Sequence, residues 1–329
     1  MEKKYKLTDE IIDFKGCKLH RIEALKDFSN VKKGDKGGFV ESEYNLSQMD
    51  NCWVYDDARV YGCGAVRNNA IICGNAEVFG SAAVFGHTKV FGNAKVYDNT
   101  VICGNTEVYG YAEVFGNALV SDNVKVFGNA KVFGNTRIWG DAMVYGCANV
   151  YGNAEVFGSA AINGYTKVFD CARVSGKAIV SVNVKVSGNA KVCGNTVVSG
   201  NAEVCGSAAV FGYTKVYGNA KVYGNTVVSG NAKVYGNSEV SGDAEVSGNA
   251  IVASNSDYII FKNWWSSGRY FTWTRSNNMW SVGCFYGTGE ELITKAYKDS
   301  ELSGREYERV VKYVESILKD SEKGQKKKQ

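Results

Sequence analysis

The chain has 329 residues, with 38 glycines, 20 tyrosines and no proline, and its formal net charge is +4. Positive and negative side chains balance along most of its length, and the surplus lies in the final KGQKKKQ, so the basic surface of a nucleic-acid-binding protein is not expected. No apolar run approaches the roughly 18–20 residues of a membrane span, and the 10 cysteines form no CxxC motif, which together predict a cytoplasmic protein with free thiols and no membrane segment.

Residues 1–48 precede the repeats and are expected to form a small β cap. KYKLTDE and KLHRIEAL predict two strands around a DFKG turn, and KKGDKGGFVESEYNLS then leads into the first repeat. The open end of a stacked β structure exposes strand edges that invite aggregation, so a cap is required there.

Residues 49–253 repeat every six residues without insertion or deletion. Val or Ile falls at every sixth position from Val54 to Val252, in 34 consecutive hexads. A small residue usually stands two positions before it, and Gly-Asn usually begins two positions after it. The small and aliphatic residues share one side of a strand, and Gly-Asn tolerates the positive φ of a tight turn. The pattern therefore predicts a β coil, because glycine in every hexad is incompatible with a helical repeat.

This small–x–aliphatic–x–Gly–Asn unit resembles the hexapeptide repeat of left-handed parallel β-helices, in which three hexads make one triangular coil. The resemblance implies an all-β solenoid of about 11 coils, spaced about 4.8 Å apart. Residues 18 apart then lie on adjacent coils. One outward face begins with Arg59, Glu77 and Lys95, so its charges alternate, whereas the other two faces are partly apolar and favour self-association into a homo-oligomer.

The same register stacks aromatic residues along one edge of the prism. Such a ladder either shields the backbone or forms a surface for a protein partner. The candidates for partner binding on this edge are Phe79, Tyr97, Phe115, Phe133 and Tyr151.

Residues 254–320 lose the repeat and are expected to form an α+β domain that caps the last coil. DYIIFKN, RYFTWTRS and MWSVGCFYG predict strands, and two capping boxes, Thr288 with Glu291 and Ser303 with Glu306, predict the start of two helices. Residues 321–329 are expected to be a basic, disordered tail. The aromatic and arginine residues of this domain either form its core or bind a partner, and the candidates are Trp264, Trp265, Arg269, Trp273 and Arg275.

The caps and the first coil resemble those of the YdcK-like β-solenoid proteins of bacteria and their phages. The matching stretches are RIEALKDFSNVKKGDKGGFVESEYNLS, CWVYDDARV and GCFYGTGEELI. Acyltransferases with this repeat place catalytic groups on loops that interrupt the coils, and they bind their CoA donor between the subunits of a trimer. The present repeats contain no such loop. His87 occupies the Asn position of its hexad, where Tyr165 and Tyr213 stand in related hexads, which favours a packing role for it.

Two functions from different classes follow. The preferred hypothesis is a rigid, non-enzymatic scaffold that binds a protein through its aromatic edge or its C-terminal domain, without cofactor or metal; a phage protein that sequesters a host factor is one version. The alternative is a trimeric acyltransferase that uses acyl-CoA, with His87 as general base. Cysteines of the repeats are never 18 apart, so no stacked metal site is expected.

Overall fold

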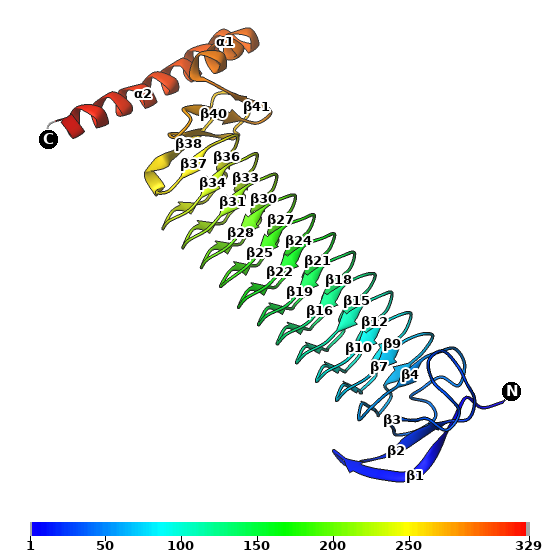
Figure 1. Cartoon of the computed structure of the whole chain (residues 1–329). Helices are drawn as coiled ribbons and strands as arrows, with labels where there is room; N and C mark the ends of the chain where they lie inside the picture. The colour runs from blue at the N-terminus through cyan, green and yellow to red at the C-terminus, as the bar shows by residue number, and fades with distance from the viewer. Residues whose placement is uncertain (1, 327–329) are drawn as a thin grey trace.

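The protein is a β-solenoid with a cap at each end (Figure 1), as described by a computed structural model for residues 2–326. A hairpin closes the N-terminal end, and a small antiparallel sheet with two helices lies at the C-terminal end (Figure 1). The predicted solenoid is therefore confirmed. Among the described residues, no helix is both long and apolar enough to span a membrane.

The solenoid contains 34 strands of two residues each, from β4 (Trp53–Val54) to β37 (Ile251–Val252), and each begins six residues after the one before. Every third strand belongs to the same sheet, so three parallel sheets run along the molecule and form its three faces. One of them holds 12 strands, from β4 to β37, and the 34 strands together make 11 coils and one further strand, in agreement with the sequence pattern.

One backbone hydrogen bond recurs through the whole solenoid. The N–H of Lys95 donates to the carbonyl of Ala112 at 2.9 Å, and that of Tyr97 donates to the carbonyl of Val114 at 3.0 Å. Equivalent bonds, in which donor and acceptor are separated by the same number of residues, continue along the solenoid to the bond from the N–H of Tyr235 to the carbonyl of Val252. They close three hexads into one coil and place equivalent side chains of adjacent coils directly over one another, as Lys95 and Glu113 are.

The interior is a continuous column of small and β-branched side chains. Every Val or Ile of the repeat, from Val54 to Val252, is at most 1% exposed, and so are the small residues that precede them. Where a threonine takes the small position, its hydroxyl usually donates to the carbonyl three residues earlier, as Thr88 does to Phe85 at 2.7 Å. A buried hydroxyl without such a partner costs about 1–3 kcal/mol, so this bond makes threonine acceptable in the core.

The corners depend on backbone with positive φ. Gly86 has φ 77°, and Asp98, which stands at the equivalent place in its hexad, has φ 58°. The Asp98 carboxylate accepts a hydrogen bond from the N–H of Gly116 in the next coil at 3.1 Å, which offsets the energetic cost of the positive φ. Three other aspartates make the same bond to the next coil, namely Asp56, Asp122 and Asp170.

The solenoid begins before residue 49. β3 (Lys36–Val40) pairs in parallel with β5 (Arg59–Val60), and Leu46 forms a bridge with Val66. Val40 faces Val60, and Val60 in turn faces Val78 in the next coil. The number of residues from Val40 to Val60 exceeds the number from Val60 to Val78 by two. The first coil therefore does not follow the six-residue repeat and cannot be recognised from it.

The expected N-terminal hairpin is present and covers the first coil. β1 (Tyr5–Phe14) and β2 (Cys17–Ala24) pair antiparallel, and β2 continues into the sheet of β3. Tyr5 and Phe28 contact Trp53 edge-on, with ring centroids 6.1 and 5.3 Å away. Trp53, which the repeat pattern places on an outward face, is therefore only 1% exposed.

The C-terminal domain begins with the 3₁₀ turn η1 (Asn255–Asp257) and the sheet of β38 (Tyr258–Lys262), β39 (Tyr270–Thr274), β40 (Met279–Val282) and β41 (Phe285–Gly287). Its side chains accept the N–H groups that have no further coil to bind. Thr272 accepts from Glu245 at 2.8 Å, Ser276 from Ile251 at 2.6 Å, and Asn255 from Glu239 at 2.7 Å. Each acceptor closes one of the three sheets.

The helices are α1 (Gly289–Asp299) and α2 (Glu301–Lys326). The predicted capping box of Thr288 and Glu291 begins α1, as expected. The second predicted box is wrong, because α2 starts at Glu301 and the Ser300 hydroxyl accepts the N–H of Ser303 at 3.1 Å. The helix also includes residues 321–326 of the expected tail, a segment rich in residues of good helix propensity; residues 327–329 lie outside the described part.

One corner carries a β-branched residue in the left-handed region. Val182 has φ 76° where the equivalent residues of the neighbouring coils are Gly164 and Gly200. This conformation costs a β-branched residue about 1–3 kcal/mol.

We predict that Val182→Gly raises the free energy of unfolding by about 1 kcal/mol, because the strain removed exceeds the entropy that glycine adds to the unfolded chain. Urea denaturation followed by circular dichroism measures the change. The matched variant Gly200→Ala should lower stability, since its new Cβ would lie 2.8 Å from the Gly218 carbonyl oxygen. Equal stability of Val182→Gly and the natural chain would contradict the strain.

Candidate functional site

His87 belongs to a column of polar corner residues. Its Nε2 lies 3.4 Å from Asn69 Nδ2, and its backbone N–H donates to the Gly104 carbonyl at 2.8 Å. The same column continues with an amide bond from Asn105 to Asn123 at 3.0 Å. His87 thus takes the place of an asparagine in a ladder. It is exposed, and within the described part of the chain its ring has no carboxylate partner that would orient it as a base.

The predicted aromatic edge forms a stack of parallel rings. From Tyr61 to Phe169 the ring centroids lie 4.8–5.1 Å apart and adjacent planes differ by no more than 5°. Phe79, Tyr97, Phe115, Phe133 and Tyr151 are each half-buried. Neighbouring rings cover one another's faces, so the ladder presents ring edges to solvent.

A second aromatic stack was not anticipated from the sequence. It runs along another corner from Phe91 through Tyr109 and Phe127 to Tyr145, with centroids 4.7–4.8 Å apart. Comparing equivalent residues of successive coils at that corner would have found it. The stack ends at Asn163, whose amide donates to the Tyr145 hydroxyl at 2.9 Å.

The candidates of the C-terminal domain separate by burial. Trp273 is 2% exposed and belongs to the core, and Trp265 packs edge-on against Phe271 and Tyr307. Trp264 is 73% exposed. Arg269 and Arg275 are also exposed. Trp264 and the two arginines therefore lie at the surface, while Trp273 is structural.

An apolar row crosses one solenoid face. It consists of the outward residues of four neighbouring strands, β19 (Met143–Val144), β22 (Ala161–Ile162), β25 (Ile179–Val180) and β28 (Val197–Val198). Met143 and Ile179 are 37% and 43% exposed. Lys125 and Lys215 lie on the next strands at either end. Ala161, which lies between Met143 and Ile179, is only 8% exposed, so the row is a small apolar surface, formed mainly by these two residues, between charged ends.

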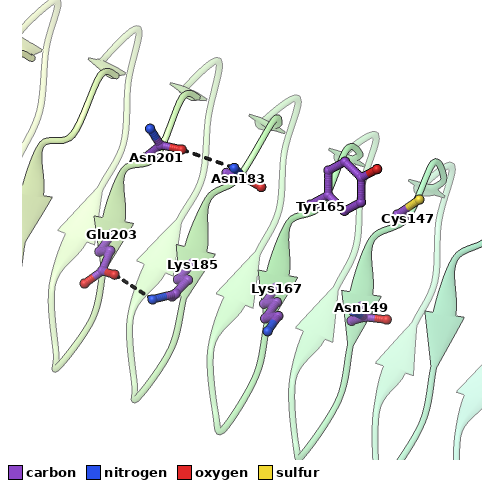
Figure 2. Close-up of a pocket in the computed structure, with 8 residues that line it drawn as sticks. All are labelled: Cys147, Asn149, Tyr165, Lys167, Asn183, Lys185, Asn201 and Glu203. Atoms are coloured by element: carbon purple, nitrogen blue, oxygen red, sulfur yellow. Dashed lines mark hydrogen bonds and ion pairs between the residues drawn. The ribbon is translucent and has the colours of Figure 1, made fainter.

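A groove of about 470 Å³ opens on the charged face of the solenoid. The corner residues of four coils form one wall, and the outward residues of the following strands form the other (Figure 2). The lining residues are Cys147, Asn149, Tyr165, Lys167, Asn183, Lys185, Asn201 and Glu203. None of them is among the site residues predicted from the sequence, because the groove depends on an interruption of the charge pattern that no local motif marks.

Two phenols of the aromatic stack bind glutamates of the charged face. The Tyr61 hydroxyl donates to Glu77 Oε2 at 2.9 Å, and that of Tyr97 donates to Glu113 Oε2 at 3.1 Å. Burial, followed by the hydrogen bond to the carboxylate, raises the pKa of both phenols. The bonds tie the edge of the prism to its charged face.

Among residues 2–326, no three histidine, cysteine, aspartate or glutamate side chains gather as a metal site would require.

No family model matches the chain. A protein of Escherichia coli (strain K12), described as "Uncharacterized acetyltransferase YdcK", is 36% identical over 72 residues, which are 20% of this chain and 22% of that protein. The chain therefore aligns with less than a quarter of its relative. Together with the solenoid, this similarity fits the YdcK-like resemblance and the acyltransferase alternative; it adds nothing in favour of a scaffold.

We predict that stability falls above pH 10. A phenol whose pKa is higher in the folded protein than in the unfolded chain stabilises the fold while it is protonated. This stabilisation is complete when the pH is below the pKa of the phenol in the unfolded chain, which is near 10, and it is lost as the pH rises toward the pKa in the folded protein. In the double variant Tyr61→Phe and Tyr97→Phe, the melting temperature should decline less between pH 9 and 11 than in the natural chain. Tyr213→Phe serves as control, because Tyr213 is 65% exposed. The same decline in all three proteins would contradict this prediction.

Proposed function

We propose that this protein is a rigid binding rod whose apolar row docks a protein partner. The observation that carries the proposal is the row itself: Met143, Ala161, Ile179 and Val197 are stacked by the coil register in the middle of the solenoid. Strands of a parallel sheet cannot rotate independently, so these side chains form a preorganised surface. Preorganisation lowers the entropy lost on binding.

The row has features that support a protein partner in particular. Its side chains are aliphatic or thioether groups that offer no hydrogen bonds, so they gain free energy only by contact with apolar surface, at roughly 25 cal/mol per Å². Lys125 and Lys215 at its ends would meet the polar rim of an interface. Trp264, exposed on the C-terminal domain, offers a second anchor of a type common in interfaces.

Acyl transfer is the second candidate, and the similarity to a protein described as an acetyltransferase favours it. In this reaction His87 Nε2 would take the proton from an acceptor hydroxyl or amine as that group attacks the thioester carbon of acyl-CoA. The carbon–sulfur bond would break, and the CoA thiolate would leave with the proton. His87 is exposed, so a neighbouring copy of the chain could complete a cleft around it.

The binding proposal is tested by one substitution in the row. We expect Ile179→Glu to lose a protein that the natural chain retains during affinity capture from native lysate, because a buried, unpaired carboxylate is costly in an interface. Ile251→Glu is the matched control, since Ile251 lies on the same face in the last coil and is 37% exposed. Mass spectrometry identifies the protein, and light scattering gives the stoichiometry of the purified complex.

Retention of the same protein by Ile179→Glu would refute the docking surface. Release of CoA thiol from acetyl-CoA by the natural chain, lost in His87→Asn, would instead establish the second candidate. Asparagine is the appropriate replacement because it is the usual residue of that ladder, so this variant should keep the fold.

A further inference from the structure

The charged face carries more lysine and arginine residues than glutamates. Its outward residues alternate in sign and pair between neighbouring strands: Lys131 with Glu113 at 3.2 Å, Lys185 with Glu203 at 2.8 Å, and Lys221 with Glu239 at 3.0 Å. Each carboxylate in these pairs neutralises a lysine of the adjacent coil. The alternation is lost between the first and second of these pairs, where Asn149 stands between two lysines and Lys167 lies beside Lys185.

The interruption begins at Asn149. This residue occupies β20 (Asn149–Val150), between Lys131 and Lys167, where the alternation calls for a glutamate. On its other side Lys167 faces Lys185, a like charge on the adjacent strand. The Lys185 ammonium bonds Glu203 (Figure 2). Lys167 has no ion pair and no side-chain hydrogen bond within the described part of the chain.

The groove opens at the point where the alternation of charge is interrupted. The groove lies along Asn149, Lys167 and Lys185, and its opposite wall includes Tyr165, which is 69% exposed (Figure 2). Asn183, on that wall, is engaged with Asn201 at 3.2 Å. Lys167, Asn149 and Tyr165 therefore line a space large enough for a side chain, and their ammonium, amide and hydroxyl groups can donate hydrogen bonds.

We propose that this groove binds a carboxylate side chain from an acidic peptide segment, which supplies in trans the glutamate that the face lacks at position 149. The inference rests on the proposed function, because it assigns a second contact of the same protein partner. A single carboxylate between Lys131 and Lys167 would occupy the position of the absent glutamate and neutralise Lys167.

The surrounding charges favour an isolated carboxylate over a polyanion. Glu113 lies beyond one end of the groove and Glu203 beyond Lys185 at the other, so the repulsion grows as negative charge extends along the face. Nucleic acid gains its affinity from many phosphate contacts along a continuous basic surface. A peptide can place one acidic residue at Lys167 and polar residues elsewhere.

The test is an amide chemical-shift titration of the full chain by nuclear magnetic resonance, at low salt, because this method detects millimolar binding and locates it. The probe is a six-residue peptide with one central glutamate, and the same peptide with glutamine is its control. We expect saturable shifts confined to residues 147–149, 165–167 and 183–185 with the glutamate peptide only.

Three variants make the test specific. Asn149→Glu supplies the missing carboxylate within the chain, and Lys167→Gln removes the ammonium; each should weaken binding about fivefold or more. Lys95→Gln removes an identical charge from the same face, where Lys95 lies between Glu77 and Glu113, and should leave the affinity within about twofold.

Undiminished binding by Asn149→Glu, equal loss in Lys95→Gln, or stronger binding of a six-nucleotide single strand at the same residues would overturn the proposal. So would the absence of shifts with the natural chain. A captured partner that still depends on Ile179 would leave the binding rod intact in any of these cases. The two proposals therefore fail separately.

Discussion

The structure depends on one repeated constraint, the backbone hydrogen bond from an N–H to a carbonyl in the next coil, as from Lys95 to Ala112. Val and Ile at every sixth position supply the hydrophobic driving force, but six-residue periodicity alone does not determine how many sides a coil has. The hydrogen bond does so, because its constant step along the chain closes three hexads into one coil. Once the coil is closed, each side chain lies over an equivalent side chain in the coils before and after it, as Lys95 lies between Glu77 and Glu113.

Because equivalent side chains are stacked in this way, the fold depends on the inward residues, and the outward and corner residues can vary independently of it. Inward positions are uniform, whereas outward and corner positions form independent columns of aromatic rings, amides and charges. A column can lose its pattern locally without disturbing the interior. His87 replaces an asparagine, Val182 replaces a glycine, and Asn149 replaces a charged residue, yet the backbone hydrogen bonds between coils at these places stay within 2.6–3.0 Å. Departures from the repeat are therefore the places where a function distinct from stability can be sought.

The repeat region could be predicted from the sequence because each hexad carries its own signal. The first coil could not, because its step from Val40 to Val60 is longer than that of any coil after it. The burial of Trp53 depends on Tyr5 and Phe28, which are distant in sequence, and the burial of Trp273 depends on the packing of the C-terminal sheet. The charged groove could be predicted only by comparing all outward residues of one face, because the absence of a charge at residue 149 produces no local sequence motif. The roles of the aromatic edge and of Trp264 remain proposals.

The most direct test of the three-hexad coil is thermal unfolding, by circular dichroism, of two deletions that start at the same residue. Removing residues 131–148 joins Ala130 to Asn149 and leaves every column in register, so this variant should unfold cooperatively at nearly the temperature of the full chain. Removing residues 131–147 displaces the strand by one residue and turns side chains of that coil to the wrong face, so it should unfold at a clearly lower temperature. Equal melting of the two deletions, or loss of structure in the first, would contradict the account.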